Sequence, residues 1–313
     1  MASTACHLYD GAMNPGTLSA SAAPARNLLV AALLACYLVW GSTYLAIRVA
    51  LTSFPPFFQM GTRFLAAGAL LFAWVAWRGG PWPTGRQWRN AAVVGILMLG
   101  AGMGLTATAE QHVGSGLVAA FIAVTPILVC LWGLAFRQRP RRLEVAGMVV
   151  GLLGVLLLVR GASFGAVPAA IACMAGATLA WSLGTVLSTT RLPLAPGAVG
   201  FASEMLCGGA ALMAVSLVLG EQPKWPPQAS AVFAWAWLVV GGSLVAFSAY
   251  LYLLAHASAA LATSYAFVNP VIALLLGVAF ANEAVSGGEW FACGVILLGV
   301  VLIFRGKTNN SAQ

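Results

Sequence analysis

The sequence predicts an all-α membrane protein whose ten transmembrane helices form two inverted repeats of five helices each. Three observations support this fold class. The chain of 313 residues is 61% hydrophobic and only 7% charged, whereas soluble globular proteins carry about 25% charged residues. Its apolar residues fall into ten runs long enough to cross a bilayer. Motifs of the first half recur in the second half at an offset close to 141 residues, so that Trp40 corresponds to Trp181.

The ten apolar runs follow one another with short connections, which indicates one bundle. A transmembrane helix needs about 20 predominantly apolar residues. We expect the spans at residues 28–50, 56–77, 90–109, 115–136, 143–160, 167–188, 197–219, 231–254, 260–281 and 289–305. This division predicts a disordered tail at 1–27, the first repeat at 28–161, the second repeat at 162–306 and a short tail at 307–313.

The basic residues between the spans predict the orientation, because cytoplasmic loops of membrane proteins carry an excess of Lys and Arg. With the N-terminus inside, the cytoplasmic segments hold eleven such residues, and the outer loops hold only Arg160 and Lys224. We therefore expect both termini in the cytoplasm and a multi-pass protein of the inner (plasma) membrane. Although the net charge is +8, its clustering between apolar runs argues against nucleic acid as a partner.

The sequence contains none of the patterns that would indicate an enzyme or a bound cofactor. Its six cysteines are scattered without the spacing of metal ligands or of a disulfide framework. It has no Walker motif, no HExxH helix and no pair of acids or Ser/His couple within a span. We expect no enzymatic activity, no metal and no cofactor, and we expect that ATP does not drive the protein from within this chain.

Two prolines interrupt apolar spans at matching places in the two halves. Pro126 lies in the fourth span and Pro270 in the ninth, 144 residues later. A proline within a helix frees the carbonyl four residues earlier, here that of Ile122 and of Ala266. Proline-interrupted segments at corresponding positions of two inverted repeats mark the binding sites of transporters. We therefore expect a solute to bind between the fourth and ninth spans.

Aromatic and hydroxyl side chains near these segments complete the predicted cavity, because solute pockets are mostly apolar with a few convergent polar groups. The aromatic rings are suited to stacking on a solute, although the same residues also serve ordinary helix packing. The hydroxyls and the amide are suited to hydrogen-bonding it. We expect the cavity to be formed by Trp40, Ser42, Thr43, Tyr44, Arg63, Thr125, Pro126, Trp181, Glu204, Tyr265, Asn269 and Pro270.

Ionisable groups inside spans are costly and are therefore candidates for function. Arg63 in the second span and Glu204 in the seventh occupy equivalent positions of the two repeats. Arg63 is expected either in the cavity or outer gate, or bonded to carbonyls at a helix end. Glu204 is expected either to couple protons or bind a solute amine, or to be hydrogen-bonded between helices. Arg48 is expected at the headgroups, and Glu110 with His112 at the interface beyond the third span.

These motifs also carry a family likeness. Val39-Trp40-Gly41-Ser42-Thr43-Tyr44, the run from Arg63 to Gly68, and the paired proline helices followed by glycine-rich fifth spans resemble the EamA family of the drug/metabolite transporter superfamily. The likeness covers about residues 28–306, and Glu110-Gln111-His112 and the run Ala260–Ala266 resemble its bacterial inner-membrane permeases. The resemblance implies a basket-shaped fold with a central cavity that carries amino acids or other small metabolites, usually outward.

The sequence therefore favours a secondary active transporter that exports amino acids or other small amphipathic metabolites by alternating access, with proton coupling through Glu204. The alternative is a passive channel or facilitator. A channel repeats its lining around an axis normal to the membrane, whereas inverted repeats favour alternating access. The expected partners are a small solute and the lipid bilayer. Gly147-x-x-x-Gly151 permits close helix packing within a monomer or at a homodimer seam.

Overall fold

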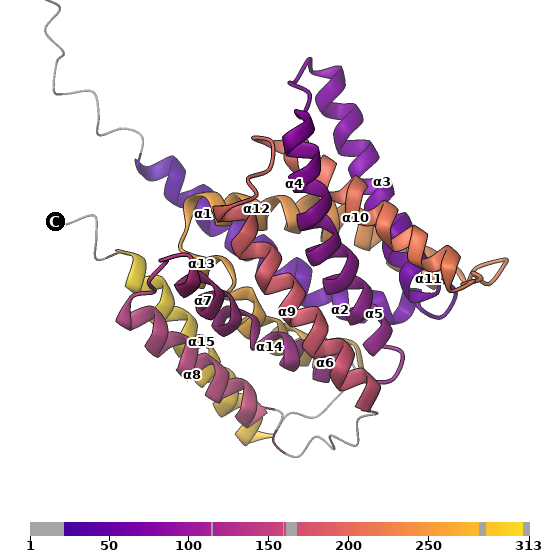
Figure 1. Cartoon of the computed structure of the whole chain (residues 1–313). Helices are drawn as coiled ribbons and strands as arrows, with labels where there is room; N and C mark the ends of the chain where they lie inside the picture. Colours follow the sequence, from indigo (N-terminus) through magenta and orange to yellow (C-terminus); the bar gives the residue numbers. More distant parts are fainter. Residues whose placement is uncertain (1–21, 114, 159, 161–167, 282–285, 309–313) are drawn as a thin grey trace, which may run out of the picture.

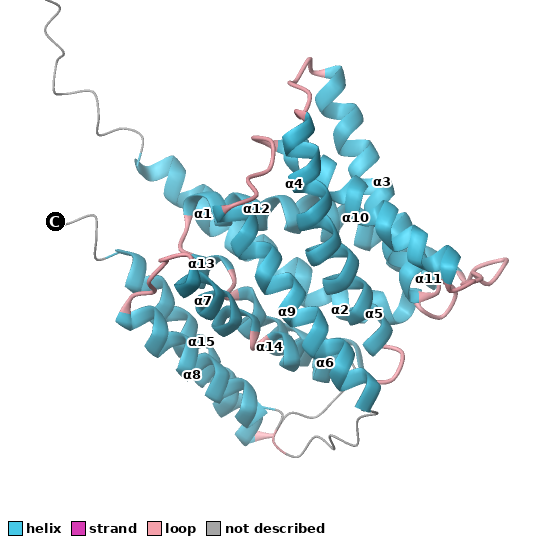
Figure 2. Ribbon diagram, viewed as in Figure 1, coloured by secondary structure: helices cyan, strands magenta, loops and turns pink. Residues whose placement is uncertain are grey.

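All regular structure in the described part of the computed structural model is helical (Figure 1; Figure 2). The structure describes residues 22–113, 115–158, 160, 168–281 and 286–308. The helical architecture confirms the predicted all-α class. The predicted boundary between residues 161 and 162, and most of both predicted tails, lie outside the described residues.

The first half of the chain forms its spans from ten helical segments, two of which are π-helical. They are α1 (Ala22–Ala35), η1 (Cys36–Trp40), α2 (Gly41–Ala50), α3 (Pro56–Trp77), α4 (Gly85–Gly95), η2 (Ile96–Met103), α5 (Gly104–Ala109), α6 (Ser115–Ile122), α7 (Thr125–Ala135) and α8 (Arg142–Leu158).

The second half forms its spans from eight segments, one of which is π-helical. They are α9 (Pro168–Thr190), α10 (Ala198–Val218), α11 (Ala229–Trp237), η3 (Leu238–Val245), α12 (Ala246–His256), α13 (Ala259–Ala262), α14 (Tyr265–Ala281) and α15 (Gly287–Thr308). The start of α1 and the end of α15 lie at the same side of the bundle (Figure 1).

Nine segments of the described chain are long and apolar enough to cross a membrane. Their ends agree with nine of the ten predicted spans to within five residues. The remaining predicted span, 143–160, corresponds to α8, which is 17 residues long. The count of ten spans is thus not confirmed, although α8 packs along α15 at one edge of the bundle (Figure 1).

Glycines bring α3 and α10 into close antiparallel contact. A Cβ atom on Gly61 would lie 2.7 Å from the Met213 side chain, and one on Gly209 would lie 2.9 Å from the Leu65 nitrogen. Helices in a membrane associate through such small residues, because lipid offers no hydrophobic force between them. The predicted second and seventh spans, which are equivalent in the two repeats, therefore pack directly on each other.

The equivalent fifth and tenth spans, α8 and α15, pack in the same antiparallel manner. A Cβ atom on Gly147 would lie 2.6 Å from the Gly299 oxygen, and one on Gly299 would lie 2.6 Å from the Gly151 nitrogen. The Gly147-x-x-x-Gly151 motif thus serves packing within the chain.

Candidate solute cavity

A cavity of about 50 Å³ lies at the centre of the bundle, between helices of both halves. It is lined by Trp40, Thr43, Tyr44, Arg63, Phe64, Leu99, Gly102, Met103, Thr106, Ile122, Thr125, Ala177, Thr178, Trp181, Gly242, Phe247 and Tyr265. Binding sites for small organic ligands are usually roughly 300 Å³ or larger. A solute larger than a few water molecules therefore requires the walls of this cavity to move.

The three π-helical segments all contribute to the wall. Trp40 ends η1, Gly102 and Met103 lie in η2, and Gly242 lies in η3. The indole Nε1 of Trp40 donates a hydrogen bond to the Gly242 carbonyl at 3.0 Å, which links η1 to η3. π-Helical turns are rare and occur frequently at functional sites. Their convergence here marks this cavity as the candidate site.

Arg63 brings a guanidinium group to the cavity from α3. The residue is 1% exposed. Its Nε donates to the Ser243 hydroxyl at 2.8 Å, and Nη1 contacts the Met60 sulfur at 3.6 Å. The guanidinium also lies 4.8 Å from the centre of the Phe64 ring. Among the described residues no carboxylate pairs with it, so its positive charge is balanced only by neutral dipoles and a ring face.

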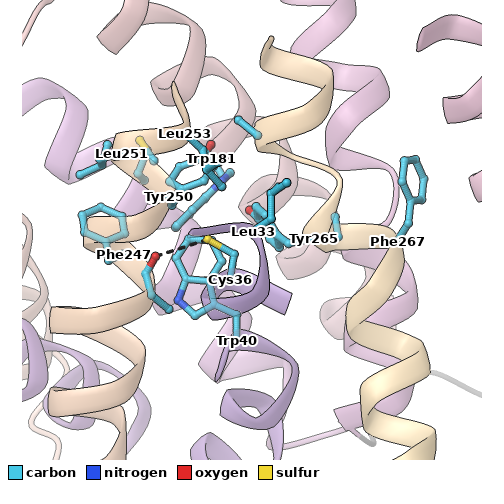
Figure 3. Close-up of a cluster of buried hydrophobic side chains, with 14 of the residues drawn as sticks. Leu33, Cys36, Trp40, Trp181, Phe247, Tyr250, Leu251, Leu253, Tyr265 and Phe267 are labelled. Carbon is cyan, nitrogen blue, oxygen red and sulfur yellow. Dashed lines mark hydrogen bonds between the residues drawn. The ribbon is translucent and has the colours of Figure 1, made fainter. Parts of the chain in front are cut away.

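Aromatic side chains close one end of the cavity. The Trp40 ring lies 4.6 Å from that of Tyr265, 5.2 Å from Tyr250 and 5.8 Å from Trp181, measured between centroids. Figure 3 shows these rings gathered at one point, with Phe247 beside them. Tyr250 and Thr185 share a hydrogen bond of 2.8 Å between their hydroxyls. We call Trp40, Trp181, Phe247, Tyr250 and Tyr265 the aromatic cluster.

A second cavity of about 280 Å³ lies beyond the aromatic cluster. It is lined by Val129, Cys130, Gly133, Gln138, Arg139, Pro140, Glu144, Thr189, Leu254, Ala257, Ser258, Ala259 and Ala260. Thr125 of α7 lines the central cavity, and Val129 lines the second one a turn later; on α12, Phe247 and Leu254 are related in the same order but two turns apart. The two cavities therefore follow one another along the same helices, and Tyr250 of the aromatic cluster lies between their linings on α12.

The hydroxyls of the central cavity differ in their hydrogen bonding. Thr43, Thr106 and Thr178 donate to carbonyls of their own helical segments at 2.7 to 2.9 Å. Thr125 makes no side-chain hydrogen bond within the described chain, although it is 1% exposed. Among the threonines of the wall, Thr125 is therefore the one whose hydroxyl makes no hydrogen bond within the described chain.

The structure brings seven of the twelve predicted site residues to this cavity. They are Trp40, Thr43, Tyr44, Arg63, Thr125, Trp181 and Tyr265. Ser42, Pro126, Glu204, Asn269 and Pro270 do not line it. Ser42 instead donates to the Val39 carbonyl at 2.7 Å and accepts from Trp237 at 3.1 Å. Asn269 lies behind Tyr44 and donates from Nδ2 to its hydroxyl at 3.1 Å.

Glu204 and Glu110 are buried carboxyls away from the cavity wall. Both oxygens of each lack a hydrogen-bond partner among the described residues. The backbone carbonyl of Glu204 lies against α4, where a Cβ atom on Gly95 would be 2.6 Å from its oxygen. Glu110 directly follows α5, at the end of the third span where it was expected, and it is 4% exposed, so that its carboxyl is buried in protein. Burial raises the pKa of the Glu110 carboxyl well above its ordinary value, and the nearby Arg48 acts against this shift.

The third and eighth spans were not predicted to contribute to the cavity, and the sixth span was predicted to contribute only Trp181. The unrecognised wall residues include Leu99, Gly102, Met103, Thr106, Thr178, Gly242 and Phe247. A signal was available in Gly100-Ala101-Gly102 and Gly241-Gly242, because the two glycine groups lie in equivalent spans of the two halves. Glycines at matching positions point to backbone that approaches a ligand or another chain segment.

Comparisons of the sequence with known proteins give a family match over most of the chain. The sequence profile of the EamA-like transporter family matches residues 27–160 and 168–305. The "uncharacterized inner membrane transporter YedA" of Escherichia coli (strain K12) is 41% identical over 281 residues, 89% of this chain and 91% of that protein. "Protein PecM" of Dickeya dadantii (strain 3937) is 27% identical over 269 residues, 85% and 86% of the two chains.

The fold of this chain is also found in solved structures. A protein crystal structure with a TM-score of 0.72 at 24% identity covers 90% of this chain and 96% of its own.

Proposed function

The chain belongs to the EamA-like transporter family, and from this premise we propose that it is a secondary active transporter working by alternating access. Its solutes are amino acids or other small amphipathic metabolites. The observation that carries the proposal is the central cavity, whose wall is mostly apolar with a few polar groups. Such a wall suits solutes that combine an apolar body with a polar group.

Alternating access requires a site that is reached from one side of the membrane at a time. Two separate cavities along the same helices, with Tyr250 of the aromatic cluster between their linings on α12, support this mechanism. The antiparallel packing of α3 on α10 and of α8 on α15 supports two inverted repeats. Rocking of one repeat against the other would then open each cavity in turn.

We place the protein in the inner membrane as a multi-pass protein with both termini in the cytoplasm. The Lys and Arg count of eleven against two supports this orientation. In it, the second cavity faces the cytoplasm and the central cavity faces outward, since the helices that line both cavities end at the cytoplasmic loops. The proposed direction of transport is outward.

Proton coupling is assigned to Glu204. Its carboxyl is fully buried within α10, and neither oxygen has a hydrogen-bond partner in the described chain. A carboxyl in such surroundings changes its protonation state when the helices around it move. Because Glu204 does not line the cavity, it would act through helix movement rather than by touching the solute.

Purified protein in proteoliposomes tests the proposal against a passive facilitator. Liposomes loaded with an unlabelled amino acid should accumulate the labelled form by counterflow, with saturation at high external concentration. A facilitator without a saturable site would equilibrate the label without overshoot. Replacing Thr125 or Thr189 by cysteine, in a chain whose own cysteines are replaced, adds a second test. Addition of a transported solute should change the reactivity of the two positions in opposite directions.

A further inference from the structure

The wall of the central cavity contains a single charged side chain, Arg63. The rest of the wall is apolar, aromatic or hydroxyl-bearing, and it includes no Asp, Glu, Lys or His. Glu204, which could have balanced Arg63, is not part of the wall. The cavity therefore carries a positive charge against a mostly apolar surface.

The guanidinium of Arg63 is fixed in place and still has donors to offer. Ser243 holds Nε and in turn donates to the Leu238 carbonyl at 3.1 Å within η3. Nη2 makes no hydrogen bond within the described chain. A Cβ atom on Gly242 would lie 2.6 Å from Nη2. A larger residue at position 242 would therefore collide with the guanidinium, and glycine leaves room for it. An Arg held in this way presents parallel N–H groups that match the two oxygens of a carboxylate.

A second side-chain donor in the wall lacks a well-placed partner. The indole Nε1 of Trp181 is buried and makes no hydrogen bond of good geometry in the described chain, although the Tyr250 and Tyr265 hydroxyls lie close to it. Together with Arg63, it makes the unsatisfied side-chain hydrogen-bonding capacity of the wall mainly that of donors. Thr125 adds a hydroxyl that either donates or accepts. Acceptor groups of a solute would satisfy this set, whereas an amine would find no carboxylate in it.

We propose that the solute is an organic anion, a carboxylate on an apolar aromatic or aliphatic body, and that Arg63 binds the carboxylate. This inference rests on the proposed transport function, and within the proposed solute class it favours anionic amphipathic metabolites over amino acids, which are zwitterions. The carboxylate supplies the counter-charge that the fold does not provide, which offsets the cost of burying an unpaired cation. The apolar body lies against the aromatic cluster, whose rings supply stacking surfaces.

A matched set of probes with one phenylalkyl body tests the charge preference. The set is 3-phenylpropanoate as the anion, phenylalanine as the zwitterion, phenethylamine as the cation and 3-phenylpropanol as the neutral compound. Binding to the purified full chain is measured by the shift in melting temperature and by quenching of tryptophan fluorescence. We expect the anion to bind most tightly, the zwitterion and the neutral compound more weakly and the cation most weakly.

Variants then test whether Arg63 is responsible. Arg63→Gln should weaken binding of the anion by roughly 10- to 100-fold, the range expected for loss of a charge-assisted hydrogen bond. Arg63→Lys keeps the positive charge but removes the paired N–H donors of the guanidinium, and it should retain part of the affinity for the anion. Arg48→Gln, which removes an exposed arginine outside the cavity wall, is the matched control and should bind as the wild type does.

Folding of the variants is checked by the melting temperature without solute. Arg63→Gln should melt at or above the wild-type temperature, since it removes a buried charge that has no partner. Preference for the cation or the zwitterion would overturn the proposal. So would binding of none of the four probes at millimolar concentration, or anion binding unchanged in Arg63→Gln.

Flux in proteoliposomes separates this inference from the function on which it rests. If the protein transports the zwitterion or the cation in preference to the anion, the anion proposal fails and transport stands. If the anion binds through Arg63 but is never moved across the membrane, the proposed transport function fails and the anion site stands.

Discussion

Arg63 and Glu204 occupy equivalent positions in the two halves of the chain, yet only Arg63 reaches the central cavity. The partner of Arg63 is Ser243 in η3, and the residue equivalent to Ser243 in the first half is Gly102 in η2. Arg63 thus has a serine hydroxyl beside it, whereas the equivalent neighbour of Glu204 is a glycine without a side chain. The Glu204 carboxyl oxygens lack hydrogen-bond partners in the described chain. The backbone of the two halves is nearly repeated, whereas the chemistry at matching positions is not.

The proline segments differ in the same way. In the first half the helix is interrupted at Ala123 and Val124, directly before Thr125 and Pro126, and Thr125 reaches the cavity. In the second half α14 continues through Pro270, and the interruption lies earlier, at Thr263 and Ser264. Its equivalent of Thr125, Asn269, is turned to Tyr44 instead. At the proline segments, the first half therefore supplies a polar group to the cavity wall, and the second half supplies a buried contact to Tyr44.

The largest expected effect concerns the difference between Arg63 and Glu204. Glu204→Gln should abolish uptake driven by a pH gradient in proteoliposomes and leave solute-for-solute exchange intact, because a glutamine cannot exchange a proton. If the variant and the wild type show the same pH dependence, Glu204 has a structural role only. Glu110→Gln is the matched control, since Glu110 is also a buried carboxyl without a hydrogen-bond partner among the described residues.

Asn269→Ala should destabilise the protein by about 1–2 kcal/mol, because it removes a buried hydrogen bond and leaves the Tyr44 hydroxyl unpaired. The measurement is the unfolding free energy in detergent. Ser42→Ala removes a hydroxyl that donates to the Val39 carbonyl and accepts from the exposed Trp237 indole, and it should change the unfolding free energy far less because that indole can reach solvent instead. An unchanged stability together with a large loss of solute affinity would place Asn269 in the binding site after all.

Pro270→Ala should stabilise the protein by about 1 kcal/mol, because it restores an amide that can bond within α14. Pro126→Ala should leave stability nearly unchanged, since Pro126 lies in the first turn of α7, where no such bond is missing. Thermal unfolding of both variants in one detergent gives the comparison. Equal effects of the two substitutions would contradict the difference between the halves.

The smallest expected effect is that of Thr125→Val. Valine keeps the shape of threonine and removes the hydroxyl, so solute affinity should fall by about 0.5–1.5 kcal/mol while stability stays the same. Thr178→Val is the matched control in the same wall, because its hydroxyl is already bonded within α9. A larger loss of solute affinity for Thr178→Val than for Thr125→Val would show that the Thr178 hydroxyl, and not that of Thr125, binds the solute.

The sequence alone predicted the all-α membrane fold class. It also predicted those candidate cavity residues whose type is unusual within a transmembrane span. Long apolar runs predicted nine spans that the structure has, and Trp40, Arg63 and Trp181 stood out as rare or repeated residues within spans. A cation inside an apolar span has few uses other than in a cavity, which is why Arg63 could be predicted.

The remainder depends on how helices are rotated against one another, which hydrophobic runs do not reveal. Nothing in the apolar sequence around Asn269 indicates that its amide turns to Tyr44. The proline rule pointed to a break near Pro270, but helical hydrogen bonding continues around it and the interruption lies at Thr263 and Ser264. Tertiary packing decided both outcomes.

The π-helical segments have a consequence for motion. A π turn holds one residue more than an α turn, and this extra residue can step along a helix by exchanging one backbone hydrogen bond for the next. Each step turns the residues it passes by about 100° around the helix axis. η2 and η3 lie at equivalent positions, 142 residues apart. Such steps would turn Gly102 and Ser243 toward or away from the solute while each helix stays continuous through the membrane.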